Sequence, residues 1–328
     1  MTAQQSPPVE TVPSTLEDQP GSHPSKNPRR PVDADLVSPF ASGGLVDVFH
    51  RRYLLKLLVQ KEVRSRYQGS VLGVMWSYVQ PLVRFAMYFF VIGLVLGLHK
   101  NLPNFAIHMF AAIVGVHFFT ETFSSGTRSI VKNKALVGKM SMPREMFPVS
   151  AVIVSAINTF PQLLILFVAA VAVGWTPDPG AILAAILGTA IVTVLGTALA
   201  LLFAGMNVFF RDFQNIVATF TLFTHWIVPM LYPFYKLATS GLGRNTIFYD
   251  AYLSNPLTVA VLLLQRAFWI PTTLGKQGFP RKASDVGFPY MPHQLMLLGL
   301  AMLLVSAIML VLCQMAFRRL EGKFAERL

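Results

Sequence analysis

Six stretches of this 328-residue chain are long, apolar and almost free of formal charge. A helix needs about 20 mostly apolar residues to cross a bilayer core of roughly 30 Å, and each stretch reaches that length. Only Arg84 and Glu121 carry a formal charge inside them. We therefore predict an all-α integral membrane protein with six transmembrane helices, at residues 71–98, 105–125, 146–176, 180–210, 213–235 and 291–317.

The basic residues between these stretches are unevenly distributed, which predicts the orientation of the chain. Lys and Arg favour the cytoplasmic side of a membrane. With the N-terminus inside, the inner segments hold 19 of the 27 Lys and Arg residues and the outer segments hold seven. We therefore expect a multi-pass protein of the plasma (inner) membrane with both termini in the cytoplasm. This bias and the attraction to anionic membrane lipids explain the net charge of +12 without a nucleic-acid partner.

The first 70 residues differ in composition from the rest of the chain. Residues 1–46 are rich in Pro and lack an apolar run, so we predict a disordered cytoplasmic tail that is not a secretory signal. Residues 47–70 carry six basic side chains around an apolar centre. They are expected to form an interfacial helix at the cytoplasmic headgroup level, and its simplest role is to anchor the chain there. Residues 71–328 then form the transmembrane domain.

Two connections carry more information than the spans. The inner loop 128–145 is both basic and apolar, which is typical of a surface that another protein binds; the alternative is an ordinary positive inner loop. The outer connection 236–290 is too long for a plain turn. Within it, residues 251–265 are uncharged but too few to span, and Asn255 followed by Pro256 interrupts them. We predict a re-entrant segment between helices five and six.

No residue set in the sequence is typical of a catalytic or metal site. The chain has no G-x-x-x-x-G-K-[ST] phosphate loop, so any ATP hydrolysis must take place on another chain. The single cysteine, Cys313, and the dispersed His108, His117 and His225 form no metal-binding pattern. Two alternative classes stay open. One is a secondary transporter, although there is no internal repeat and only one intramembrane acid; the other is a membrane-embedded glycosyltransferase or acyltransferase.

Six short motifs lie in or beside the predicted spans: YQGSVLGVMWS (67–77), LVGKMSMPRE (136–145), FRDFQN (210–215), MLYP (230–233), SNPL (254–257) and FRRLE (317–321). The first is similar to the segment that leads into the first span of type-2 ABC transporter permeases that export cell-surface polysaccharides. The second is similar to the coupling-helix region of that family. All six follow the family's order across residues 50–328, and the long Pro-rich tail is similar to that of actinobacterial cell-wall galactan exporters.

The resemblance implies a permease subunit that is not an enzyme and has no cofactor of its own. Two copies would form a homodimer and dock two ATP-binding subunits, which would hold ATP and Mg. The cargo would be a glycan, such as galactan, O-antigen or teichoic acid, on a polyprenyl diphosphate lipid. The resemblance also implies that the N-terminal helix and the inner loop contact the ATPase, and the loop residues are Lys132, Lys134, Leu136, Val137, Lys139, Met140, Pro143, Arg144 and Glu145.

Aromatic residues on two spans are candidates to line the passage, because a glycan has apolar ring faces that slide over aromatic rings. Aromatic stripes in membrane helices also face lipid or pack, so this alternative stays open. The set recurs at near-helical spacing in spans one and five, and it consists of Tyr78, Phe85, Tyr88, Phe89, Phe220, Phe223 and Trp226.

Three arginines are candidates to meet the lipid diphosphate. A charge at the depth of Arg84 costs roughly 2.5–3.5 kcal/mol on insertion scales, so we expect Arg84 either to contact substrate or to pair with an acid. Arg64 and Arg66, with the adjacent Tyr67, lie at the cytoplasmic mouth of span one. A guanidinium group can bind two phosphate oxygens at once, so these arginines are candidates for a gate that receives the lipid diphosphate. Anchoring to lipid headgroups is the alternative.

Overall fold

Helices form the framework of the protein. The computed structural model describes residues 44–97, 100, 102–137, 142–241, 246–275, 286 and 289–324, and all of them lie in the unit Pro39–Leu328. This described part contains helices and no strand, so the predicted all-α class is confirmed. Most of the predicted tail 1–46 lies outside the described residues.

Within the described residues, five helical segments are long and apolar enough to cross a membrane. The first comprises α3 (Trp76–Tyr88) and the π-helical turns Phe89–Val95 that follow it. The other four are single helices, and they match predicted spans two, three, four and six: α4 (Phe105–Lys132), α6 (Met146–Ala172), α7 (Pro179–Phe209) and α13 (Leu295–Glu321).

The predicted fifth span, 213–235, is helical only in part. Its helix α8 (Phe213–Ile227) has 15 residues, fewer than the roughly 20 that a full crossing takes. It ends there because Pro229 follows Val228, and a residue before proline is disfavoured in the helical region; Val228 has φ −85° and ψ 155°. A buried non-helical stretch then leads to α9 (Phe234–Thr239).

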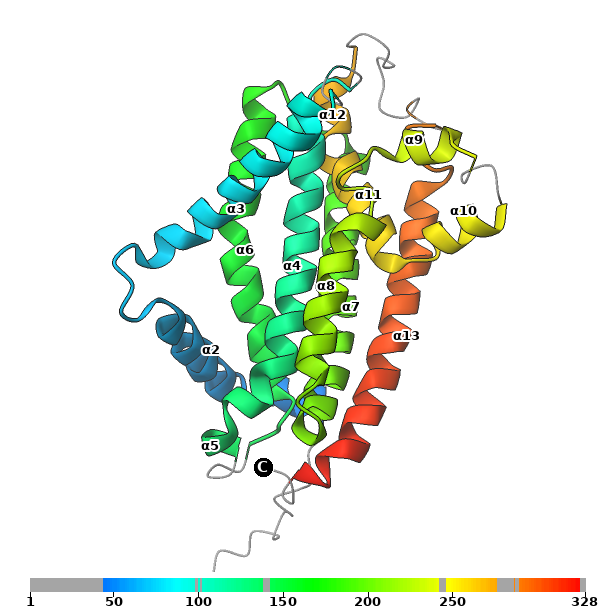
Figure 1. The fold of residues 1–328 in the computed structure, drawn as a ribbon. Coiled ribbons are helices and arrows are strands. Elements are labelled where there is room, and N and C mark those ends of the chain that lie inside the picture. Colours follow the sequence, from blue (N-terminus) through cyan, green and yellow to red (C-terminus); the bar gives the residue numbers. More distant parts are fainter. Residues whose placement is uncertain are drawn as a thin grey trace, which may run out of the picture. The chain divides into compact units, whose positions relative to one another are not determined.

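The predicted re-entrant segment is a broken helix pair. Helices α10 (Thr246–Leu253) and α11 (Pro256–Phe268) are bent against each other by 73°. Asn255 causes the restart, because its side chain accepts a hydrogen bond from the Leu257 backbone N–H at 3.0 Å and caps α11. In Figure 1, α10 runs inward and α11 returns toward α12 (Ile270–Thr273). The interruption predicted at residues 255–256 is therefore confirmed.

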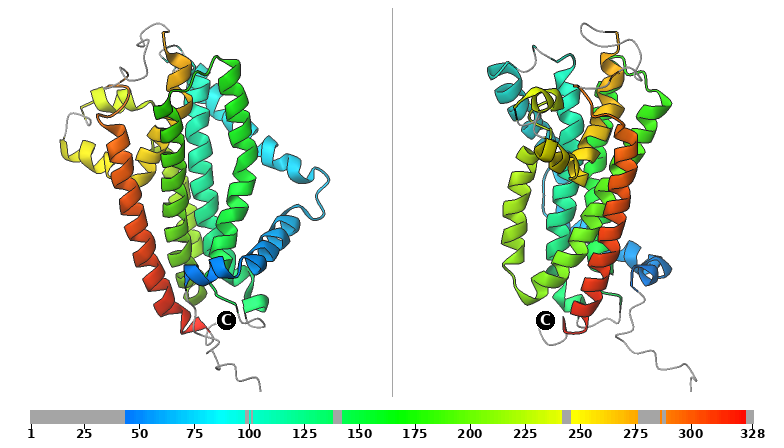
Figure 2. Two further views of the ribbon diagram at one scale, coloured as in Figure 1. Left: turned by 180° about the vertical axis from the view of Figure 1, so that it is seen from behind. Right: turned by 90° about the vertical axis from the view of Figure 1, so that its right-hand side faces the viewer.

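Helix α4 lies at the centre of the helix bundle. It packs against α6, α7, α8 and α11, and α13 lies on the far side of α7 from α4 (Figures 1 and 2). Glycines permit the close crossing of α4 and α7: a Cβ on Gly126 would collide with Ala200, and one on Gly196 would collide with Thr122. Two short helices, α1 (Leu45–His50) and α2 (Arg52–Tyr67), precede the bundle.

The bundle has two distinct ends, which we name the α2 end and the α12 end. The α2 end holds α1, α2, α5 (Lys134–Val137) and the last turns of α13 (Figure 2). An apolar cluster joins these elements there: Val48, Leu55, Leu58, Ile130, Val137, Met146, Phe147, Ala204, Val208, Phe317 and Phe324. The helical structure predicted for 47–70 is confirmed as far as Tyr67, in two pieces that meet at Arg51, and its place at the headgroup level stays a prediction.

This cluster corrects one expectation about the inner loop. Its apolar side chains were expected to form a surface open to another protein. Instead Ile130 and Val137 are buried in the cluster, and Leu136 and Met142 pack against it. They are held inside the protein because Leu55 and Leu58 of α2 and Phe317 near the end of α13 belong to the same cluster.

The α12 end is fastened mainly by uncharged side chains that bond to backbone carbonyls. Trp269 Nε1 donates to the Pro103 carbonyl at 2.9 Å, and Asn104 Nδ2 donates to the Thr272 carbonyl at 2.7 Å. Trp175 Nε1 donates to the Ala267 carbonyl at 3.0 Å. These bonds tie α12 and α11 to the starts or ends of α4 and α6.

Candidate functional site

A cavity of about 550 Å³ opens at the α2 end between α2, α4 and α6. Five of its 14 lining residues carry a formal charge, and Gln214 at the start of α8 also lines it. Ionisable groups within membrane proteins usually face a water-filled cavity or a functional site. The charged residues that line it are Glu62, Arg66, Glu121, Arg128 and Lys132.

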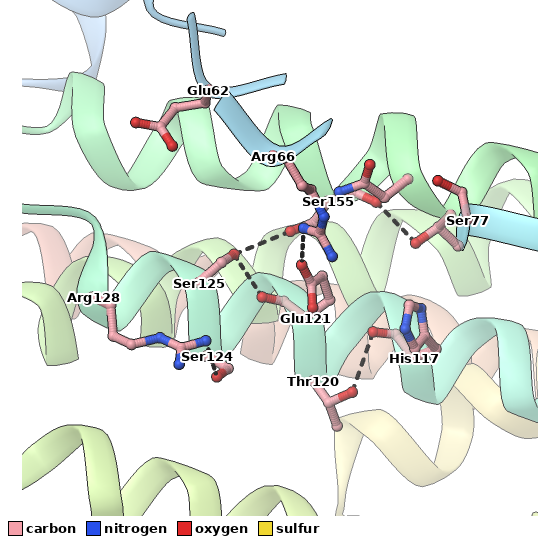
Figure 3. Close-up of polar contacts among 12 residues, drawn as sticks. Glu62, Arg66, Ser77, His117, Thr120, Glu121, Ser124, Ser125, Arg128 and Ser155 are labelled. Atoms are coloured by element: carbon pink, nitrogen blue, oxygen red, sulfur yellow. Dashed lines mark hydrogen bonds and ion pairs between the residues drawn. The ribbon is translucent and has the colours of Figure 1, made fainter. Parts of the chain in front are cut away.

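Two ion pairs join α2 to α4 across this cavity. Arg66 Nη1 lies 2.5 Å from Glu121 Oε1, and Lys132 Nζ lies 2.5 Å from Glu62 Oε2. Figure 3 shows Arg66 reaching from α2 to Glu121 on α4. Lys61 also contacts Glu62, at 3.2 Å. All three cations are more than two-fifths exposed, so each pair contributes little to stability and is easily exchanged.

The carboxyl group of Glu62 has a pKa below its ordinary value. Burial alone would raise this pKa, but hydrogen bonds from Lys132, Lys61 and Asn133 together outweigh burial and favour the ionised form. Glu62 is therefore charged at neutral pH, and it holds α2 against the end of α4.

A second cavity, of about 190 Å³, adjoins the first. Arg66 lines both, so the guanidinium lies where the two cavities meet. The second cavity lies between the end of α2, the start of α3, α4 and α6. Beside Arg66 it is lined by Tyr67, Ser70, Trp76, Ser77, Gln80, Pro81, His117, Asn158 and Gln162.

Hydrogen bonds hold the walls of the second cavity together. The Tyr67 hydroxyl lies 2.6 Å from Ser77 Oγ and donates to Asn158 Oδ1 at 2.8 Å, which links α2, α3 and α6. Gln162 Nε2 lies 3.1 Å from His117 Nδ1 and links α6 to α4. Sequence reasoning missed Asn158 and Gln162. The sequence did carry a signal for them, since they are two amides four residues apart inside an apolar span. Residues at that spacing share one helix face.

The structure separates the residues predicted to form the gate. Arg66 and Tyr67 line the cavities, whereas Arg64 is exposed and lines neither of them. Arg84 is half-buried on α3 and close enough to His117 and His225 for its charge to act on both. Within the described residues Arg84 forms no ion pair, and Glu121 pairs with Arg66 instead.

The predicted pathway aromatics divide into a packed set and an exposed set. On the first span, Phe85 stacks on Phe89 and meets Phe110 of α4 edge to face, and Tyr88 also packs against the core. Tyr78 is half-buried. On α8, Phe220 contacts Phe123 of α4 and is 48% exposed. Phe223 and Trp226 are more exposed still. The α8 set is therefore the more exposed of the two, and a role of either set in lining a passage stays a prediction.

Some of the predicted coupling residues are exposed and others are buried. Lys132 and Lys134 are exposed at the α2 end. Pro143 and Glu145 are buried, and Glu145 accepts a hydrogen bond from Gln314 of α13 at 3.0 Å.

The neighbouring Arg144 fastens the inner loop to α13 and the residues after it. Its Nη1 donates to the Glu321 carbonyl at 2.7 Å, and its guanidinium lies 5.5 Å from the centre of the Phe324 ring. Lys139 and Met140 lie outside the described residues. No group of three or more His, Cys, Asp or Glu residues suited to a metal ion occurs in the described part of the chain.

Comparison with known proteins identifies the family. The model of the ABC-2 type transporter family matches residues 53–268, which include both cavities and the re-entrant pair. The chain therefore belongs to the ABC-2 type transporter family and is a multi-pass membrane protein.

Its relatives include two O-antigen export system permease proteins. The O-antigen export system permease protein RfbA of Myxococcus xanthus is 29% identical over 187 residues, or 57% of this chain and 71% of the relative. The RfbA protein of Klebsiella pneumoniae is 24% identical over 183 residues, or 55% of this chain and 68% of the relative.

Proposed function

We propose that this chain is the permease subunit of an ABC exporter that carries a lipid-linked polysaccharide across the inner membrane. The similarity to O-antigen export permeases over more than half of the chain carries this proposal. The energy would come from ATP hydrolysis on a separate subunit, since this chain has no phosphate-binding loop of its own. The α2 end, which holds most of the basic inner segments, would face the cytoplasm.

In this proposal the lipid diphosphate binds at Arg66. The guanidinium lies at the junction of two polar cavities and is reachable from the cytoplasmic side. In the structure its partner is the carboxylate of Glu121. A diphosphate offers more charge and more acceptor oxygens than one carboxylate, so it competes with Glu121 for the same donors. Arrival of the substrate would thus break one of the two ion pairs that hold α2 against α4.

The passage would form between two copies of the chain. The exposed aromatic face of α8, with Phe223 and Trp226, offers flat apolar surfaces to sugar rings without fixing them by hydrogen bonds. Arg84, on the first span, is close enough to His225 of α8 for its charge to act there. In this proposal it is the next cation that the diphosphate meets after it leaves Arg66. The cargo would be a galactan, O-antigen or teichoic acid on a polyprenyl diphosphate.

The ATP-binding subunits would dock at the α2 end. Lys132 and Lys134 are exposed there, and the inner loop is tied to α13 through Arg144 and Glu145. Movement of the loop would therefore reach both α2, through Glu62 and Lys132, and the last transmembrane helix. This arrangement gives the ATPase two connections into the bundle.

Depletion of the chain in its host cell tests the proposal. Surface polysaccharide should fall and lipid-linked glycan should accumulate at the cytoplasmic face of the membrane, and the wild-type chain should restore export. A nucleotide-binding subunit should co-purify with the chain, and reversal of charge at Lys132 and Lys134 should weaken that association. Full surface polysaccharide in depleted cells would reject the function.

A further inference from the structure

The second cavity differs from the first in charge. Its lining contains amides, hydroxyls, one indole and the imidazole of His117, and Arg66 is the one Lys, Arg, Asp or Glu among the described residues that line it. The first cavity, by contrast, is lined by carboxylates and several cations. A ligand that bridges the two cavities at Arg66 would therefore carry an anionic group next to an uncharged polar group.

Asn158 and Gln162, which line the second cavity, each leave one buried amide atom without a protein partner. Asn158 is 5% exposed and Gln162 is 1% exposed. Neither Asn158 Nδ2 nor Gln162 Oε1 has a hydrogen-bond partner in the described part of the chain. Buried polar groups are nearly always paired, so such a donor and acceptor on one helix face indicate a polar ligand.

Neighbouring residues fix which atom of each amide is left for the ligand. The Tyr67 hydroxyl donates to Asn158 Oδ1, which leaves the NH₂ group as the free donor. Gln162 Nε2 contacts His117, which leaves Oε1 as the free acceptor. The protein thus presents one donor and one acceptor four residues apart along α6.

This arrangement matches the chemistry of a sugar. Adjacent hydroxyl groups each donate and accept, so they can satisfy both amides at once. Trp76 is 43% exposed at the rim and offers an aromatic face to the apolar side of a ring. At about 190 Å³ the cavity holds several times the roughly 30 Å³ that one water takes up, yet it is below the roughly 300 Å³ of a pocket for a larger ligand. One sugar ring fits that range.

We propose that the second cavity binds the sugar that is attached directly to the diphosphate. This inference rests on the proposed function, because Arg66 must hold the diphosphate for its first sugar to reach Asn158 and Gln162. The cavity would then select lipids that carry a glycan over the bare carrier lipid. The bare lipid is left behind after export, and its rejection would prevent a futile cycle.

A phospholipid headgroup with free hydroxyls on a phosphate shares this chemistry, so the test includes it. The full-length chain is placed in phosphatidylcholine nanodiscs, and binding of farnesyl diphosphate is compared with binding of the same lipid carrying one glucose or one galactose. Phosphatidylglycerol is added as a competitor. The variants are Asn158→Leu, Gln162→Met and Arg66→Gln. Asn207→Leu is the matched control, because Asn207 is also buried with one unpartnered oxygen but lines neither cavity.

The wild-type protein should bind at least one sugar-bearing lipid about tenfold more tightly than farnesyl diphosphate, as expected for two added hydrogen bonds. Asn158→Leu and Gln162→Met should reduce that ratio toward one and leave affinity for the bare diphosphate unchanged, and Asn207→Leu should keep the ratio. Arg66→Gln should weaken binding of all diphosphate lipids.

Three results would overturn the proposal in distinguishable ways. Equal binding of bare and sugar-bearing lipids, with Arg66→Gln still harmful, would reject the sugar site and leave the proposed function standing. Competition by phosphatidylglycerol that depends on Asn158 would assign the cavity to a phospholipid headgroup. Absence of any diphosphate binding that depends on Arg66 would reject both the sugar site and the proposed gate.

Discussion

The two ends of the bundle are held together by different kinds of bond. At the α12 end, the buried Trp269 and the half-buried Trp175 and Asn104 donate to backbone carbonyls, and Arg266 forms a two-point pair with Asp178 at 2.9 and 3.1 Å. At the α2 end, exposed cations pair with Glu62 and Glu121 around a cavity of about 550 Å³. Bonds of the first kind are costly to break and those of the second kind exchange readily. We infer that the α12 end stays closed while α2 moves.

The largest expected effect is at Arg66. Arg66→Gln should lower export roughly 10- to 100-fold, because a hydrogen bond between charged groups contributes about 1.5–3 kcal/mol. Arg64→Gln is the matched control on the same helix, and it should change export less than twofold. Surface glycan measured at equal protein level checks both. Equal losses in the two variants would favour general headgroup anchoring by α2.

The next effect is on stability at the α12 end. Asp178 has a pKa below its ordinary value, chiefly because Arg266 donates hydrogen bonds to it. Asp178→Asn retains a side-chain oxygen that can cap α7 but removes the charge opposite Arg266, whose side chain is only 11% exposed. The free energy of unfolding should fall by about 1–2 kcal/mol, a figure reduced because Asp178 is partly exposed. Lys132→Met at the α2 end should cost less than about 1 kcal/mol. Thermal unfolding in detergent compares the two, and the reverse order would contradict the contrast between the ends.

A smaller gain is expected when Glu121 is neutralised. Glu121→Gln removes the carboxylate that competes for Arg66, so affinity for a diphosphate lipid should rise about three- to tenfold. Transport should slow at saturating substrate, because release from Arg66 is no longer assisted by a returning carboxylate. Lipid binding in nanodiscs measures the first change. Weaker binding in Glu121→Gln would mean that Glu121 positions Arg66 for the substrate.

The smallest effect concerns pH. The pKa of Glu62 is lowered in the folded protein. The stabilisation that its carboxylate gives the folded state is therefore fully present above the ordinary carboxyl pKa of 4.5, and it is lost as pH falls through the lowered pKa. The attachment of α2 should therefore loosen in acid, by less than about 1 kcal/mol. A spin label at Ser65→Cys, with Cys313→Ser, should become more mobile between pH 7 and pH 3. Glu62→Gln should show the mobile spectrum already at pH 7; an unchanged pH response in that variant would exclude Glu62 as its source.

The fold was largely predictable from sequence because helix length and charge pattern are local properties. The four uninterrupted spans and the break at Asn255 and Pro256 needed only composition and known capping chemistry. Pro229 also carried the signal that ended α8 early, but the apolar run on both sides of it concealed the break.

The candidate site was less predictable because it depends on contacts between distant segments. Arg66 and Glu121 are 55 positions apart, and nothing local indicates that Glu121 pairs with Arg66 and not with Arg84. Asn158 and Gln162 stand in an otherwise apolar span, and their role became visible only beside Tyr67 and His117. The apolar residues of the inner loop were misplaced for the same reason, because α2 and α13 cover them.

The most direct test of the account is a pair of distances measured by spin labels in nanodiscs. One pair, Ser65→Cys with Ala135→Cys, reports on α2 against α5; the other, Val173→Cys with Leu274→Cys, reports on the α12 end, both in a Cys313→Ser background. Addition of a sugar-bearing diphosphate lipid should lengthen or broaden the first distance and leave the second unchanged. A fixed first distance with a changed second one would contradict the account.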